Sequence, residues 1–217
     1  MSTKSLIKFD LLTNAKDSLK RAVELMAWGD LSSDHARLKH AIMNAAHAIE
    51  LLLKERLRRE HPAFIWQNVD KFRNLQAPTV NSEAAIGRLT SICNVEFTEI
   101  DRASVARLRA TRNAIEHYEW QSSESEAKII VGNALSFALG FAAEHLKIDL
   151  SADFKQDDTW AMLIREAQEF TQAHGARIAT RAPNVFLARC DECEAETVTS
   201  IGSCLLCGHW QDMGVFS

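Results

Sequence analysis

The sequence has few residues that interrupt helices and few that favour strands. Its 217 residues include one tyrosine and three prolines, and no proline lies between Pro78 and Pro183. Long runs of valine, isoleucine and threonine are also scarce. Because proline breaks helices, whereas β-branched and aromatic residues favour strands, this composition argues against a strand-rich fold. It predicts a mainly α-helical protein.

The sequence also lacks a long uninterrupted apolar segment. A membrane-spanning helix needs about 18 or more such residues. The best candidate, 129–143, is shorter and is interrupted by Gly132, Asn133, Ser136 and Gly140. The first residues, MSTKSLIKFDLL, carry charges within their only apolar stretch, which is unlike a secretory signal. We therefore expect a cytoplasmic protein with no membrane contact.

An excess of basic charge is missing as well. The formal net charge is −4, so the molecule as a whole does not attract nucleic acid, and any such contact must come from a local basic patch. The apolar fraction of 47% is sufficient for a hydrophobic core. A chain of this length accommodates one domain of ordinary size and a small appendage.

Helical periodicity and turn signals divide the chain into segments. Helices are expected over 5–28, 34–60, 82–93, 98–120, 126–146 and 159–180. Gly29 is expected to end the first, and Ser32, Ser33 and Asp34 are candidate N-caps of the second. The connections are 62–81, which has room for a short helix, and the polar segment 150–158. We interpret 1–150 as a helical bundle, 151–182 as a linker with an additional helix, and 183–217 as a separate cysteine module.

One stretch of the fourth helix carries groups suited to phosphodiester chemistry. The motif is Arg112-Asn113-Ala114-Ile115-Glu116-His117. An arginine presents a fixed fork of donors to phosphate oxygens, and a histidine exchanges protons near neutral pH. With RNA as substrate the neighbouring 2′-hydroxyl can be the nucleophile, so no metal is needed. The candidate catalytic residues are therefore Arg112, Asn113 and His117.

The spacing of Arg112 and His117 leaves their geometry open. Five residues along an ideal helix correspond to a rotation of about 140°, so the two side chains do not stack on one face, whereas Asn113 and His117 do. Either the long arginine reaches round, or the helix loosens near His117, or the pair works with a second copy across a dimer axis. An arginine and a histidine at this spacing also occur by chance in many helices.

A second polar group lies in the apolar helix 34–60. His40, Asn44 and His47 follow one stripe, with Glu50 and Lys54 close by. One reading is structural: these side chains face solvent or find partners in the core. The functional reading is that His47 or Glu50 supports the Arg112 and His117 site. The sequence leaves both open.

Four of the five cysteines are concentrated near the C-terminus. Cys190 and Cys193 form one C-x-x-C pair, and Cys204 and Cys207 form a second pair ten residues later. In a reducing compartment this spacing indicates a tetrahedral zinc site. Because four thiolates leave no open position, we expect structural zinc, with a short two-stranded ribbon over 196–202. The alternative role is docking of nucleic acid or protein, using nearby basic and stacking groups, namely Arg177, Arg181, Arg189, His209 and Trp210.

Together these features resemble the HEPN family over about residues 4–150. The features are the helical bundle, the segment AHAIELLLKERL followed by His61-Pro62, and RNAIEH on a later helix. In that family an R-x4–6-H motif, often with a polar residue after the arginine, marks the catalytically competent members. Arg112 and His117 match the motif, and Asn113 matches the polar position. The zinc ribbon lies outside the common domain.

The resemblance implies a metal-independent endoribonuclease whose cleft forms where two protomers bring their motifs together. It therefore implies an RNA substrate and a homodimer. Many members of the family are prokaryotic toxins or antiviral defence effectors, held in check by an antitoxin or a sensor, so a regulatory protein is a further expected partner. The first alternative is a non-catalytic HEPN-like module that binds RNA, nucleotide or protein. The second is a zinc-ribbon DNA-binding regulator, which has no helix-turn-helix or basic stripe in its favour.

Overall fold

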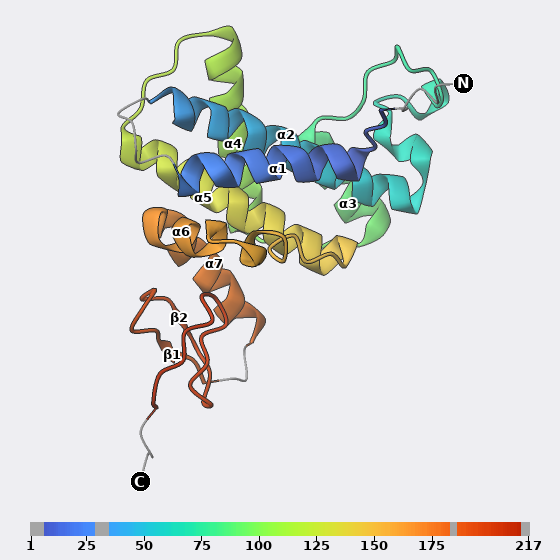
Figure 1. Ribbon diagram of the computed structural model, residues 1–217. Helices are drawn as coiled ribbons and strands as arrows, with labels where there is room; N and C mark the ends of the chain where they lie inside the picture. Colours follow the sequence, from blue (N-terminus) through green and yellow to red (C-terminus); the bar gives the residue numbers. More distant parts are fainter. Residues whose placement is uncertain (1–6, 29–34, 183–185, 214–217) are drawn as a thin grey trace, which may run out of the picture.

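The computed structural model describes residues 7–28, 35–182 and 186–213, and over these it is mainly α-helical with one small sheet (Figure 1). This confirms the predicted fold class. The helices and strands are α1 (Leu11–Ala27), α2 (Ala36–Glu60), α3 (Ser82–Cys93), α4 (Glu99–His117), α5 (Glu124–Phe141), α6 (Thr159–Glu166), α7 (Gln168–Arg181), β1 (Ala188–Arg189) and β2 (Glu196–Val198). Short 3-10 turns occupy Pro62–Ile65, Val69–Lys71 and Phe154–Gln156.

The first two helices begin later in the chain than the sequence predicted. In α1 the side chain of Asp10 accepts a hydrogen bond from the backbone N–H of Thr13 at 2.8 Å, so the helix starts at Leu11 rather than near residue 5. In α2 the first helical residue is Ala36. The expected end signal at Gly29 and the expected caps Ser32, Ser33 and Asp34 lie outside the described residues.

Helix α2 is the centre of the bundle. It packs along α1 and also contacts α3, α4 and α5 (Figure 1). Residues 41–53 of this helix are mostly small or branched apolar residues, and Ala41, Ile42, Ala48, Leu52 and Leu53 are each at most 1% exposed. A helix surrounded on most sides by others needs this composition, because each face buries apolar area.

The most apolar helix of the bundle is α5. With the π-helical turn Ala142–Leu146 it forms a continuous stretch, Glu124–Leu146, that is long and apolar enough to cross a membrane by length and composition. However, 72% of its apolar window is buried inside the protein, between α2 and α7. Gly132 permits the approach of α7, since a Cβ there would lie 2.7 Å from the backbone nitrogen of Phe170. The stretch therefore behaves as a core helix.

The prediction of a single helix over 159–180 is wrong, because the helix is interrupted at Ala167. The backbone there has φ −115° and ψ 71°, which separates α6 from α7. The Thr171 hydroxyl donates to the Ile164 carbonyl at 2.7 Å, which satisfies an acceptor near the end of α6. Packing of Phe170 against Gly132 sets the direction of α7, and Phe170 is fully buried. The break is thus imposed by the tertiary structure.

The segment 150–158 and the cysteine module both pack on the helices. Leu150 and Phe154 are 4% and 5% exposed, so the segment expected as a polar linker has two apolar anchors. The cysteine module lies beyond α6 and α7, at one end of the molecule (Figure 1). The indole nitrogen of Trp160 donates to the Leu206 carbonyl at 3.0 Å. Gly175 on α7 lies close to Ala195, where an added Cβ would be 2.9 Å away.

The strands of the cysteine module also differ from the expected ribbon. Strands β1 and β2 pair antiparallel on either side of the first C-x-x-C pair, rather than both within 196–202. Only β2, Glu196–Val198, falls in the predicted range. A single bridge from Val198 to Cys204 continues the pairing toward the second pair of cysteines. The first C-x-x-C pair therefore forms the turn of the hairpin, so one strand precedes it and lies outside the predicted range 196–202.

Candidate functional sites

Helix α4, which carries the Arg112 motif, is held at its first turn by two sets of contacts. Thr98 and Asp101 form a capping box, in which each side chain accepts a hydrogen bond from the other residue's backbone N–H. The buried carboxylate of Asp101 also forms an ion pair with Arg177 of α7. Burial raises the pKa of Asp101, but the hydrogen bonds and charge of Arg177 and the bonds from Thr98 outweigh it and lower the pKa below its usual value.

At the other end of α4, Glu116 joins the two motif residues. Its Oε2 atom lies 2.8 Å from Nε of Arg112 and 3.7 Å from Nε2 of His117. The helix stays regular up to His117, since the Tyr118 N–H donates to the Ala114 carbonyl at 2.9 Å. The helix therefore does not loosen before His117, and the arginine reaches along α4 to Glu116. Pairing of the motif with a second copy across a dimer axis stays a prediction.

Asn113 contacts the same guanidinium. Nη1 of Arg112 donates to Oδ1 of Asn113 at 3.4 Å, which is a long hydrogen bond. The Arg112 side chain is 41% exposed and the His117 side chain 63% exposed. The three predicted residues thus form one accessible cluster at the end of α4. An exposed guanidinium and imidazole are available to a ligand from solvent.

A pocket of about 330 Å³ opens between α2 and α4 beside this cluster. Arg112 and Glu116 line it from α4, and His47 and Glu50 line it from α2. His117 does not line this pocket. The structure therefore brings the polar stripe of α2 together with Arg112, while the imidazole of His117 lies outside. Glu116, which the sequence reading did not select, is common to both places.

The polar residues of α2 have partners that fix their side chains. The Nδ1 atom of His47 is 2.9 Å from the hydroxyl of Ser18 on α1. Glu50 accepts from Lys54 at 2.6 Å, and Lys54 also donates to Thr79 at 2.8 Å. The structural reading of the stripe is therefore met for Glu50 and Lys54. His47 has one anchored nitrogen and faces the pocket, so it also satisfies the geometric part of the functional reading.

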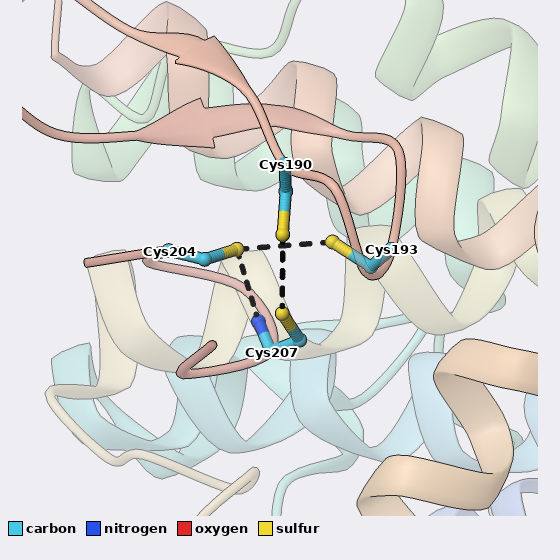
Figure 2. Close-up of side chains that lie close together, drawn as sticks. All are labelled: Cys190, Cys193, Cys204 and Cys207. Carbon is cyan, nitrogen blue, oxygen red and sulfur yellow. Dashed lines mark hydrogen bonds between the residues drawn. The ribbon is translucent and has the colours of Figure 1, made fainter. Parts of the chain in front are cut away.

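The four C-terminal cysteines converge on one point (Figure 2). All four sulfur atoms lie within 4.8 Å of one another, and they could hold a metal ion. The Sγ atoms of Cys190 and Cys207 are 3.6 Å apart, and those of Cys193 and Cys204 are 3.7 Å apart. A disulfide requires about 2.05 Å, so the sulfurs are not paired in that way. Cys190, Cys193 and Cys204 are at most 3% exposed.

Hydrogen bonds to the sulfurs favour the thiolate form in part of the cluster. Burial raises the pKa of Cys204, but the N–H groups of Cys207 and Leu206 and the Thr197 hydroxyl outweigh it and lower that pKa to about 7. Burial raises the pKa of Cys193 to about 11, and it also raises the pKa of Cys207. A bound cation would compensate this cost, because metal ligation deprotonates thiols.

Comparison with known proteins adds no relative to this picture. No family model matches the chain, and neither a curated protein nor a solved structure matches it. The interpretation of both sites accordingly depends on their own geometry and chemistry.

Proposed function

We propose that this protein is a metal-independent endoribonuclease of the HEPN type, with Arg112 and His117 as its catalytic groups. The observation that carries the proposal is the cluster at the end of α4, where the guanidinium and the imidazole both approach one oxygen of the Glu116 carboxylate, at 2.8 and 3.7 Å. Both side chains are exposed, so a polynucleotide reaches them without a change in the fold. The helical bundle supports the same proposal, since its mainly α architecture agrees with the resemblance.

The chemistry follows from the two groups. Arg112 holds the scissile phosphate and stabilises the negative charge that develops on its oxygens. His117, as general base, takes the proton from the 2′-hydroxyl, whose oxygen then attacks the phosphorus. The bond to the 5′-oxygen breaks, and that oxygen receives a proton from a second acid. The products are a 2′,3′-cyclic phosphate and a 5′-hydroxyl, and Asn113 orients the guanidinium or contacts the phosphate.

A homodimer supplies the second acid in this scheme. Two copies of α4 that meet at their C-terminal ends provide two imidazoles, one for each proton transfer. Tyr118, which directly follows the last residue of α4, is 81% exposed and offers a large aromatic ring to such an interface. A protein of this kind is expected in the cytoplasm, as a toxin or antiviral defence effector restrained by an antitoxin or another regulatory protein.

We propose zinc as the metal of the cysteine cluster, in a structural role. A tetrahedral ion with Zn–S bonds of about 2.3 Å separates its sulfurs by about 3.8 Å. The observed separations of 3.6 and 3.7 Å fit this spacing. Four thiolates leave no position for water or substrate, so the residues that would hold zinc, Cys190, Cys193, Cys204 and Cys207, contribute stability rather than catalysis.

A second candidate function is a non-catalytic module that binds RNA, nucleotide or protein. The observation in its favour is the apolar surface of the cysteine module, where Ile201 is 78%, Trp210 64% and Leu205 48% exposed. A large exposed indole stacks on a base or packs into a protein partner. In that case the Arg112–Glu116 ion pair is a structural contact.

Incubation of the purified protein with total RNA and a labelled tRNA pool, in the presence of EDTA, tests the main proposal. The proposed enzyme leaves 2′,3′-cyclic phosphate or 3′-phosphate ends and 5′-hydroxyl ends. Ends with a 5′-phosphate and a 3′-hydroxyl would contradict this mechanism. Binding of RNA without any cleavage would favour the second candidate.

A further inference from the structure

The pocket between α2 and α4 has the size of a small-molecule site. Its volume of about 330 Å³ is at the lower end of the range of roughly 300–1,000 Å³ for ligand pockets. It lies directly beside the proposed phosphate-binding arginine, because Arg112 forms part of its wall. A ligand in this pocket would therefore be a direct neighbour of a phosphate held by Arg112.

The deeper wall of the pocket is apolar. Ile49 of α2 and Val105 and Leu108 of α4 line it, and each is at most 3% exposed. Ala46 lines it as well and is partly buried. Because these side chains are held in the core, the wall is preformed and flat groups can lie against it without losing hydrogen bonds.

The polar wall of the pocket has unused hydrogen-bonding atoms. The side-chain N–H of Asn44 donates to the His40 carbonyl at 2.8 Å, and within the described chain its Oδ1 has no hydrogen-bond partner. Nδ1 of His47 is engaged by Ser18, which leaves Nε2 for a ligand. An amide oxygen and a ring nitrogen on adjacent turns of one helix match the polar edge of a nucleobase or the hydroxyls of a ribose.

The charges at the pocket favour a monoanion over a metal ion. Its two carboxylates already have cationic partners, since Glu50 pairs with Lys54 at 2.6 Å and Glu116 pairs with Arg112 at 2.8 Å. Arg112 uses Nε and one N–H of Nη1 in its contacts with Glu116 and Asn113, so Nη2 and the second N–H of Nη1 remain as donors to a phosphate. Hard cations require carboxylates that are free to coordinate them.

We propose that this pocket binds one nucleotide of the RNA substrate, with its phosphate at Arg112, its base against the apolar wall, and its polar edge at Asn44 and His47. The inference rests on the proposed ribonuclease function and deepens it, because it assigns the residues that select the nucleotide next to the scissile bond. The pocket is formed within one chain. Nucleotide binding therefore does not require the dimer.

The test is isothermal titration calorimetry of the wild-type protein with each of the four nucleoside 3′-monophosphates and with inorganic phosphate. We expect at least one nucleotide to bind about tenfold more tightly than phosphate, a difference that reports the nucleoside, and differences among the four nucleotides report the base. Ala46→Leu adds three carbon atoms at the apolar wall, narrows the pocket and should weaken this preference. The matched control is Ala110→Leu, which places the same side chain on the exposed face of α4, outside the pocket. Asn44→Ala should weaken binding of the same nucleotide by removing its side-chain amide. This second variant keeps the test valid if Ala46→Leu does not fold.

Three results would overturn the inference. The first is equal affinity for phosphate and for all four nucleotides. The second is a preference for a nucleotide over phosphate that survives in both Ala46→Leu and Asn44→Ala. The third is loss of this preference in the control Ala110→Leu alone. Cleavage of RNA by the same samples is scored separately. Nucleotide binding without cleavage would contradict the ribonuclease proposal and support the nucleotide pocket. Cleavage without a preference for a nucleotide over phosphate would support the ribonuclease proposal and contradict the nucleotide pocket.

Discussion

Arg112 and Glu116 form an ion pair along α4, with Nε of the arginine 2.8 Å from Oε2 of the glutamate. The same oxygen lies 3.7 Å from Nε2 of His117. A phosphate that binds Arg112 must therefore compete with a carboxylate of the same chain. Glu116 is thus a residue that both gathers the two motif side chains and limits their affinity for an anion.

Neutralising this carboxylate should strengthen binding of RNA. An ion pair of this exposure is worth about 0.2–1 kcal/mol, so Glu116→Gln should lower the Kd for a non-cleavable 2′-O-methyl oligonucleotide by about 1.5- to 5-fold. Glu119→Gln is the control, because it makes the same charge change at an exposed residue whose contact is with Gln121. Fluorescence anisotropy measures both. Equal effects of the two variants would mean that only net charge matters.

Loss of the metal should destabilise the C-terminal part of the protein. We expect about one zinc per chain by atomic emission, and its loss in Cys193→Ser and Cys204→Ser. The Tm should fall by at least about 5 °C, since each kcal/mol lost shifts it by roughly 2–4 °C in a chain of this length. Cys93→Ser is the matched control, because Cys93 lies on α3, away from the cluster. Full metal content in Cys204→Ser would contradict the four-thiolate site.

The ion pair between Asp101 and Arg177 should make stability depend on acid pH. The pKa of Asp101 is lowered in the folded state, so the unfolded state takes up a proton first as the pH falls. This contribution is complete above the unfolded value of about 3.8 and is lost as the pH falls through the lower folded value. Asp101→Asn removes the carboxylate partner of Arg177, whose Nε keeps its hydrogen bond to Ser136, and should cost about 3–5 kcal/mol at pH 7 in urea unfolding.

The comparison for that variant is Asp17→Asn, at an exposed carboxylate of α1. It should change the free energy of unfolding by no more than about 0.5 kcal/mol. If Asp101→Asn were equally mild at pH 7, the ion pair would not be what ties α7 to α4.

His174 should be a second source of acid sensitivity. It lies on α7, stacked on Phe170 at a centroid distance of 5.2 Å, and its buried Nδ1 has no hydrogen-bond partner among the residues that the structure describes. Burial, helped by the charges of Arg177 and Arg181, lowers its pKa from 6.5 to about 3. Between these values the unfolded state binds the extra proton, so stability falls as the pH drops below 6.5.

Replacing this imidazole by an apolar ring should remove part of that sensitivity. His174→Phe is expected to unfold at the same or higher urea concentration at pH 7, and to lose less stability than wild type between pH 7 and pH 5. His40→Gln, at an exposed position of α2, should follow the wild-type pH dependence. If His174→Phe had the same pH dependence of stability as wild type, the buried imidazole would not contribute to the loss of stability at acid pH.

The sequence predicted the parts of the fold that depend on local patterns. Apolar periodicity identified α2 and α5, and the cysteine spacing identified the four-cysteine cluster that could hold a metal ion. The break at Ala167 was missed because no proline or glycine marks it; contacts with Gly132 and Ile164 impose it. The pocket was missed because the crossing of α2 over α4 is set by packing. The Arg112–Glu116 pair could have been found, since the residues are four apart on one helix.

The central claim is that His117 moves a proton during RNA cleavage. The most direct measurement compares wild type, His117→Ala and His40→Ala on a labelled tRNA pool in EDTA, with end-group analysis. Loss of a general acid or base costs about 10²- to 10⁴-fold in rate, so His117→Ala should lose cleavage by at least 100-fold on that scale. His40→Ala, at an exposed residue outside the pocket, should keep the wild-type rate and leave the same cyclic phosphate ends. Wild-type cleavage by a folded His117→Ala protein would contradict the claim.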